Sequence, residues 1–178
     1  GKSLSEFESM AASTIEECDR LLDMINTMLM ISKTESGVDE LSPEEVDIAG
    51  LVRDACELFT PVAEDKRVSL NCHVPEKNTL LGDKQMIQRM LSNVLDNAVK
   101  YSPPGTNIDI EVKLTPDGAL LSVADEGMGI PTEDLERVFN KFYRVQRPDG
   151  VGGTGLGLSI CRNAVRKMGG EIWAESPP

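Results

Sequence analysis

The sequence predicts an α+β sandwich with a mixed β-sheet, preceded by a long N-terminal helix. Segments with helical spacing of apolar residues are interspersed with segments that alternate like strands, and successive strands stand in hairpin-like as well as crossover relations. This mixture argues against a doubly wound parallel sheet. Of the 178 residues, 40% are hydrophobic, enough for a core in one domain or a domain with an appendage. The first 36 residues carry a separate heptad pattern.

Net charge and histidine content exclude several function classes. With 18 basic and 30 acidic residues, the chain has a net charge of −12, which argues against a nucleic-acid binder or a protein of anionic membrane surfaces. The single histidine, His73, lies in a strand-like run and excludes a multi-histidine metal site or a catalytic triad that needs a second histidine.

The cysteines and the hydropathy indicate a cytoplasmic location. No two of the four cysteines form a C-x-x-C pair, so we interpret them as small buried residues in a reducing cytosol. No apolar run is long enough to span a membrane, and no signal peptide is recognisable. We expect no direct membrane contact by this chain; any membrane anchor would lie elsewhere in a parent protein.

Residues 1–36 are predicted to form one helix. Their apolar positions follow the a/d pattern, and a second stripe beside it favours a four-helix bundle over a two-stranded coiled coil. The heptad positions are Leu4, Phe7, Ala11, Thr14, Cys18, Leu21, Ile25 and Met28. The alternative is a terminal helix folded back on its own domain. Gly37 ends the pattern, Pro43 marks a boundary, and residues 37–43 are therefore the predicted linker.

A second domain is predicted over residues 44–178. Asp83 is a good N-cap for a helix that ends at Ser102-Pro-Pro-Gly. In the preceding helix, residues 49–66, Pro61 allows a kink or break. Thr115-Pro-Asp-Gly joins two strands as a hairpin. The predicted strands are 46–48, 68–74, 79–82, 108–114, 119–124 and 171–174, and the predicted helices are 49–66, 83–101 and 155–168.

The helix over residues 83–101 carries the first of three polar clusters. Asn93 and Asn97 stand four residues apart and share one helical face, and Lys100 reaches the same side. Two amide oxygens and a cation suit a magnesium–phosphate group, since Mg²⁺ prefers hard oxygen ligands. The alternative is a pair of solvent-exposed asparagines.

The second and third clusters are rich in glycine. The second cluster, Asp125-Glu-Gly127-Met-Gly129-Ile130, follows a strand. Its aspartate can accept a hydrogen bond from an amino group, while the glycines let the backbone come close to a flat ring. The alternative is a tight turn capped by the aspartate. Residues 150–158 open a helix, and glycines there present free N–H groups to an anion; the alternative is a flexible hinge. No strand precedes them, so the dinucleotide-binding fingerprint fails on context, and no Walker-type lysine follows.

The local charge near the third cluster departs from the global value. Residues 141–167 contain six basic residues against Asp149 alone, a local charge of +5. A polyanion site is therefore expected in this segment.

Together, these segments resemble the conserved boxes of sensor histidine kinases. Residues 93–101 resemble the N box, 125–129 the first glycine box, 138–144 the F box and 153–158 the second glycine box. Residues 1–36 resemble the second helix of the dimerisation and phosphotransfer hairpin. The resemblance covers nearly the whole chain, and the four boxes occur in the order and spacing of the family.

The resemblance implies a Bergerat fold of the GHKL type, with a mainly antiparallel sheet, helices on one face, and a site for ATP and Mg²⁺. Asn97 would bind magnesium, with Asn93 in or near the same shell. Lys100 would meet the phosphates, and Arg144 would neutralise charge, so that catalysis is mostly positioning and charge stabilisation.

The resemblance also assigns the remaining contacts. The Tyr101 ring would pack against the adenine and Asp125 would accept from its amino group, in a pocket shaped by Gly127, Gly129 and Ile130. Residues 139–154 would form a mobile lid that includes the nucleotide contact Phe142. The implied phosphate loop consists of Gly153, Thr154, Gly155, Leu156, Gly157 and Leu158.

The implied activity is protein-histidine kinase, with the acceptor outside this chain. The acceptor histidine of the family, on the first hairpin helix, has no counterpart here, and the last strand of the family is missing after Glu175. Expected partners are a phosphotransfer hairpin of the same or a second subunit, a response-regulator receiver domain, and a second copy of the parent protein. The alternatives are a hydrolytic ATPase of the same superfamily, disfavoured because Asn93 stands where a basic glutamate is needed, and a non-catalytic nucleotide-sensing module.

Overall fold

The computed structural model describes residues 41–76, 78–116, 118–145 and 153–176, together with scattered positions between 10 and 25. The described positions between 10 and 25 are helical, and the Thr14 hydroxyl donates a hydrogen bond of 2.8 Å to the Met10 carbonyl oxygen. Most of the predicted helix 1–36 and of the linker 37–43 lies outside the described residues, so this division of the chain stays a prediction.

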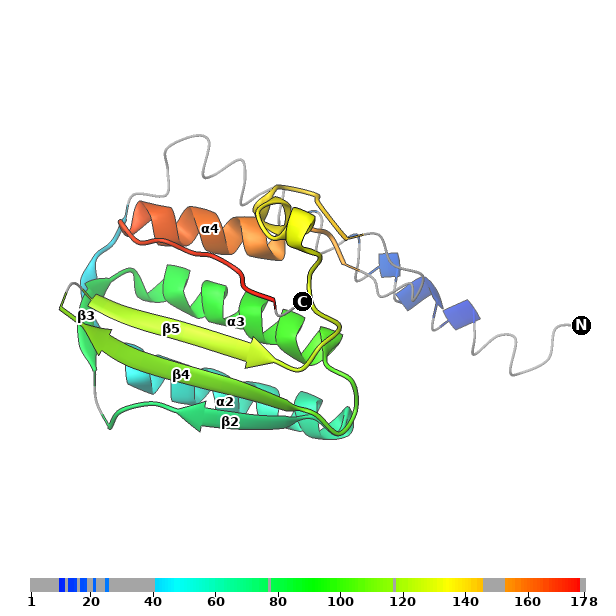
Figure 1. Ribbon diagram of the computed structural model, residues 1–178, viewed down its shortest axis with the longest axis horizontal. Coiled ribbons are helices and arrows are strands. Elements are labelled where there is room, and N and C mark those ends of the chain that lie inside the picture. The colour runs from blue at the N-terminus through cyan, green and yellow to red at the C-terminus, as the bar shows by residue number, and fades with distance from the viewer. Residues whose placement is uncertain are drawn as a thin grey trace, which may run out of the picture.

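The described domain is an α+β sandwich, as predicted (Figure 1). In its three-stranded sheet the central strand is β4 (Asn107–Thr115), which runs parallel to β2 (Ser69–His73) and antiparallel to β5 (Gly118–Asp125). A separate antiparallel pair consists of β1 (Glu44–Asp47) and β3 (Thr79–Gly82). The sheet is therefore mixed and mainly antiparallel.

Helices cover one face of the three-stranded sheet (Figure 1). These are α2 (Ile48–Asp65) and α3 (Lys84–Tyr101), while α4 (Gly157–Lys167) packs along α3. Two short 3₁₀ helices, η1 (Thr132–Asp134) and η2 (Arg137–Phe139), lie in the connection from β5 to α4.

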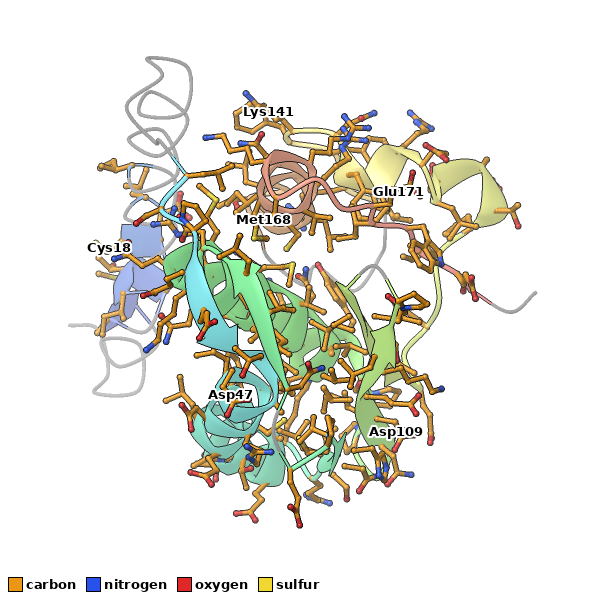
Figure 2. The ribbon with its side chains drawn as sticks, turned by 90° about the vertical axis from the view of Figure 1, so that its left-hand side faces the viewer. Cys18, Asp47, Asp109, Lys141, Met168 and Glu171 are labelled. Carbon is orange, nitrogen blue, oxygen red and sulfur yellow. The ribbon has the colours of Figure 1, made fainter. Side chains whose placement is uncertain are left out.

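The core lies between the sheet and these helices. Ile108 and Ile110 on β4 are fully buried, whereas Asp109 between them is exposed to solvent. They belong to one apolar cluster with Val52 of α2 and Leu95 of α3. Alternate residues of a strand point to opposite faces, so one face of the sheet is covered and the other exposed. Figure 2 shows Asp109 on that outer face, away from the helices.

Two boundaries near α2 differ from prediction. The Asp47 carboxylate caps α2 by accepting from the Gly50 N–H at 3.1 Å, so the helix starts at Ile48 and the strand before it ends earlier than predicted. Helix α2 continues through Pro61 to Asp65, so no break occurs at this proline. The carbonyl deprived of its donor belongs to Glu57, which is exposed, so water can replace the missing N–H.

Helix α3 and the hairpin confirm the predictions from capping and turn residues. The Asp83 carboxylate accepts from the Met86 N–H at 2.9 Å, and α3 ends at Tyr101. The hairpin closes with Thr115 opposite Gly118.

The C-terminal region contains less regular secondary structure than predicted. Helix α4 begins at Gly157 rather than at Gly155, because Gly155 has a φ of +70° and cannot continue a right-handed helix. The predicted strand 171–174 is wrong: residues 171–176 are part of neither sheet of the described domain. A strand exists only through a ladder of backbone hydrogen bonds to a neighbour, which sequence alternation does not supply.

Candidate functional site

Helix α3 presents a polar row on the side that meets α4. Leu91, Leu95 and Ala98 are buried in the core, while Asn93 and Asn97 are half-buried on another face of the helix. The Asn93 side-chain N–H donates to the Arg89 carbonyl oxygen at 2.9 Å, as expected for a polar side chain on a helix. This hydrogen bond commits the amide nitrogen and leaves Oδ1 as the acceptor that faces α4.

The first turn of α4 lies against the two asparagines. A Cβ atom placed on Gly157 would lie 3.1 Å from Asn93 Oδ1 and 3.6 Å from Asn97 Nδ2. The absence of a side chain at this position therefore allows the backbone of α4 to approach both amide groups. The structure thus brings the first and third polar clusters together, although more than fifty residues separate them in the sequence.

The glycine-rich loop before α4 lies on the C-terminal end of α3. A Cβ atom on Gly153 would lie 3.1 Å from Lys100 Nζ and 3.9 Å from the Tyr101 hydroxyl oxygen. The Lys100 ammonium is 5.8 Å from the centroid of the Tyr101 ring. Thr154, half-buried, follows Gly153 in this loop. Lys100 is therefore the cation of α3 closest to the loop that is expected to hold an anion.

The N-terminus of α4 differs from those of α2 and α3. Asp47 and Asp83 cap the latter two helices, but the cap residue of α4 is Leu156, which makes no side-chain capping hydrogen bond. Leu156 is only 2% exposed and anchors the start of the helix in the protein interior, while Leu158, two residues later, is half-buried. The first N–H groups of a helix without a side-chain cap are available to an anion, which the helix dipole also attracts.

The turn after β5 brings the second cluster to the same end of α3. The Asp125 carboxylate accepts from the Gly127 N–H at 2.9 Å through Oδ1. A Cβ atom on Gly127 would lie 3.0 Å from the Tyr101 carbonyl oxygen, so the turn packs directly on the last residue of α3. The Asp125 carboxylate thus caps a tight turn through Oδ1 and retains Oδ2 as a further acceptor.

Ser176 completes this turn and was missed by sequence reasoning. Its hydroxyl oxygen accepts from the Ile130 N–H at 3.0 Å and would lie 2.7 Å from a Cβ atom on Gly129, whose φ is +68°. No spacing rule identifies such a residue, because the hydrogen bond joins positions 46 residues apart.

The F-box region reaches the glycine loop through its backbone. The Phe142 N–H donates to the Gly155 carbonyl oxygen at 2.9 Å, whereas the Phe142 side chain is 61% exposed. Arg144 is exposed two residues further on. Phe142 is therefore placed next to the loop by its main chain rather than by its ring.

The residues present fit a magnesium–nucleotide complex better than a metal held by the protein alone. Within the described ranges, no three His, Cys, Asp or Glu side chains gather as metal ligands. Amide oxygens at Asn93 and Asn97, with a cation and backbone N–H groups nearby, suit a Mg²⁺ that keeps phosphate oxygens in its shell. In the part of the chain that the structure describes, no helix has the length and apolar character to cross a membrane.

Known proteins resemble the region that contains this site. Residues 82–178 match the family model described as histidine kinase-, DNA gyrase B- and HSP90-like ATPase. Sensor histidine kinase WalK of Bacillus subtilis is 34% identical over 168 residues, which make up 92% of this chain and 27% of WalK. The chain spans 27 to 44% of the length of the curated relatives that it matches.

Solved structures resemble the same region. Full-length ShkA in complex with AMPPNP is 30% identical with a TM-score of 0.79, and the match covers 99% of this chain and 37% of that one. The mycobacterial sensor histidine kinase MprB is 32% identical with a TM-score of 0.65, and the match covers 74% of this chain and 83% of that one.

Proposed function

We propose that this chain, a member of the histidine kinase-, DNA gyrase B- and HSP90-like ATPases, binds Mg·ATP and donates the γ-phosphate to a histidine outside the chain. The chain carries the catalytic ATP-binding domain of a sensor histidine kinase. The match to a nucleotide-bound kinase structure supports the choice of nucleotide. The observation that carries the proposal is the packing of Asn93 and Asn97 against Gly157, with Lys100 beside Gly153.

Each polar group has a role in this proposal. Asn97 binds Mg²⁺, and Asn93 lies in or near the same shell. Lys100, Arg144 and the uncapped N–H groups at the start of α4 hold the phosphates. Fixed cations and N–H groups of this kind stabilise the charge that moves on phosphoryl transfer without reorganising.

The adenine base would lie against the turn after β5. Asp125 accepts from the adenine amino group through the carboxylate oxygen that does not bind the Gly127 N–H. Gly127, Gly129 and Ile130 bring the backbone close to the ring, and Tyr101 packs on it. Ser176, hydrogen-bonded to Ile130, fixes the far side of this turn.

We further propose the context of the reaction. Residues 1–36 form the second helix of a dimerisation and phosphotransfer hairpin, and residues 44–178 form the catalytic domain. The phosphate passes from ATP to the imidazole nitrogen of a histidine on the hairpin, with ADP as the leaving group, and then to an aspartate of a response-regulator receiver domain. The parent protein acts as a homodimer.

Hydrolysis of ATP is the weaker alternative. A hydrolytic site needs a base to activate water, and the amide of Asn93 has no useful basicity. Its nitrogen is also engaged with the Arg89 carbonyl oxygen.

Calorimetric titration with AMPPNP, with and without magnesium, tests the proposal. We expect binding of AMPPNP that magnesium strengthens and, when ATP replaces this non-hydrolysable analogue, transfer of the γ-phosphate to a separately supplied hairpin that bears the acceptor histidine. The absence of binding at millimolar AMPPNP would refute the proposed function. Steady release of phosphate that depends on Asn93, without transfer to the hairpin, would favour the hydrolase.

A further inference from the structure

Asp134 is a buried carboxylate in the connection between β5 and α4. Asp134 is 8% exposed, and its carboxylate accepts hydrogen bonds from the Tyr143 hydroxyl and, at 3.1 Å, from Arg137 Nη1. Burying a carboxylate is costly unless donors compensate for the lost water. Both donors are therefore needed to keep Asp134 inside the protein.

The three side chains close a triangle. The guanidinium carbon of Arg137 lies 4.4 Å from the centroid of the Tyr143 ring while its nitrogen bonds Asp134. The hydrogen bond to Asp134 is the main cause that raises the pKa of Tyr143 above its ordinary value of 10.0. We call Asp134, Arg137 and Tyr143 the tyrosine clamp.

The clamp adjoins a strained piece of backbone. Phe142, directly before Tyr143, has a φ of +64°, a left-handed conformation that bulky residues adopt only when their surroundings hold them there. Its N–H donates to the Gly155 carbonyl oxygen at 2.9 Å. A Cβ atom on Gly155 would lie 2.8 Å from both the Phe142 carbonyl carbon and the Tyr143 carbonyl oxygen, so the two backbones touch.

This contact passes the position of the clamp on to the phosphate loop. Gly155 lies two residues before Gly157, the residue that packs on Asn93 and Asn97. We propose that Tyr143 and Asp134 are positioning residues for the triphosphate: the clamp holds the backbone at Phe142 and Tyr143, on which the start of the phosphate loop rests. Neither side chain touches the nucleotide. This inference rests on the proposed function.

The inference predicts a selective effect on the phosphates. The contacts that join the clamp to the phosphate loop run through Phe142 and Gly155, whereas on the adenine side the Asp125 carboxylate bonds the Gly127 N–H. Loosening the clamp should therefore weaken binding of a triphosphate while leaving that of the nucleoside unchanged. A merely structural role would weaken both ligands equally or neither.

The test uses Tyr143→Phe, which removes only the hydroxyl. We expect its affinity for AMPPNP with magnesium, measured by calorimetry, to fall about three- to tenfold. This is less than the full effect of losing one hydrogen bond to a charged group, because the lost bond acts on the phosphate loop only through the backbone. Its affinity for adenosine, measured by competition against AMPPNP, should equal that of the wild type. Asp134→Asn, which keeps a neutral acceptor of the same shape, should show a smaller loss of the same kind.

Asp109→Asn is the matched control. Asp109 accepts a hydrogen bond from Asn71 at 2.9 Å on the outer face of the sheet, so this variant removes the same charge far from the loop. It should bind both ligands as the wild type does. If folded Tyr143→Phe and Asp134→Asn keep wild-type affinity for AMPPNP, or lose both ligands in equal measure, the inference is wrong although the proposed function stands. If the wild type itself does not bind AMPPNP, the proposed function fails first.

Discussion

Asn93 and Gly157 face each other where α3 meets α4, so closely that a side chain at position 157 would crowd the Asn93 amide. A Cβ atom at position 157 would lie 3.1 Å from the Asn93 side-chain oxygen. Close approach of this kind favours glycine at position 157. Substitutions of Gly157 and of the asparagines therefore test the two sides of this contact separately.

Gly157→Ala should separate binding from stability. The added methyl group crowds the Asn93 oxygen and should weaken AMPPNP binding in the presence of magnesium. Alanine is a better helix former than glycine by up to about 1 kcal/mol, so the thermal midpoint should stay level or rise. Calorimetric titration and thermal unfolding measure the two effects. Unchanged affinity would show that this contact does not shape the nucleotide site.

Asn97→Ala should reduce the part of AMPPNP affinity that depends on magnesium, because it removes the proposed metal ligand. Titration with and without magnesium measures this difference directly. Asn71→Ala is the matched control, since Asn71 lies on the exposed face of the sheet, where its side-chain amide donates to Asp109 at 2.9 Å. An equal magnesium effect in wild type and Asn97→Ala would disprove the metal assignment.

Lys66→Met should destabilise the end of α3 that carries Lys100 and Tyr101. The Lys66 ammonium donates to the Val99 carbonyl oxygen at 2.8 Å and to the Lys100 carbonyl oxygen at 2.5 Å, where the helix dipole also favours a cation. The expected loss is about 1–2 kcal/mol of unfolding free energy, measured with urea. Lys113→Met is the control: its surface ion pair with Glu111 at 2.7 Å should contribute at most about 1 kcal/mol.

Asp83→Ala should cost about 1 kcal/mol, since it removes the cap of α3 and the acceptor of the Ser42 N–H at 3.2 Å. Asp83→Asn keeps a side-chain oxygen and should retain most of the stability. Urea unfolding of both variants checks the difference. Equal stability of Asp83→Ala and wild type would mean that the cap contributes nothing to the folded state.

The Cys161 thiol should make the fold sensitive to alkaline pH. Burial raises its pKa from 9.0 to about 12, so its contribution to stability is fully present below pH 9.0 and is lost as the pH rises towards 12. Between pH 8 and 10.5 this thiol should lower the unfolding free energy by about 2 kcal/mol. Urea unfolding of wild type and Cys161→Ala at both pH values measures the effect. A drop of the same size in both proteins would rule out this origin.

Local chemistry made much of the fold predictable from the sequence. The cap at Asp83, the turn between Thr115 and Gly118 and the spacing of Asn93 and Asn97 all depend on residues within a few positions of one another. Whether Pro61 interrupts α2 and whether residues 171–176 form a strand were not predictable in this way. Both depend on what surrounds the segment, namely solvent at Glu57 and a hydrogen-bonding neighbour for a strand.

The sequence by itself determined which residues are candidates for the site: the asparagines, Lys100, the glycine loop and Asp125 all stand out by residue type and spacing. Tertiary structure alone decided that they meet. The apolar face of α3 packs on the sheet, and this packing turns Asn93 and Asn97 towards α4. It also placed Ser176 on Ile130 and Tyr143 on Asp134, contacts between residues whose separation along the chain follows no helical or strand period. Periodicity describes neighbours along the chain, whereas a site is set by which buried surfaces come together.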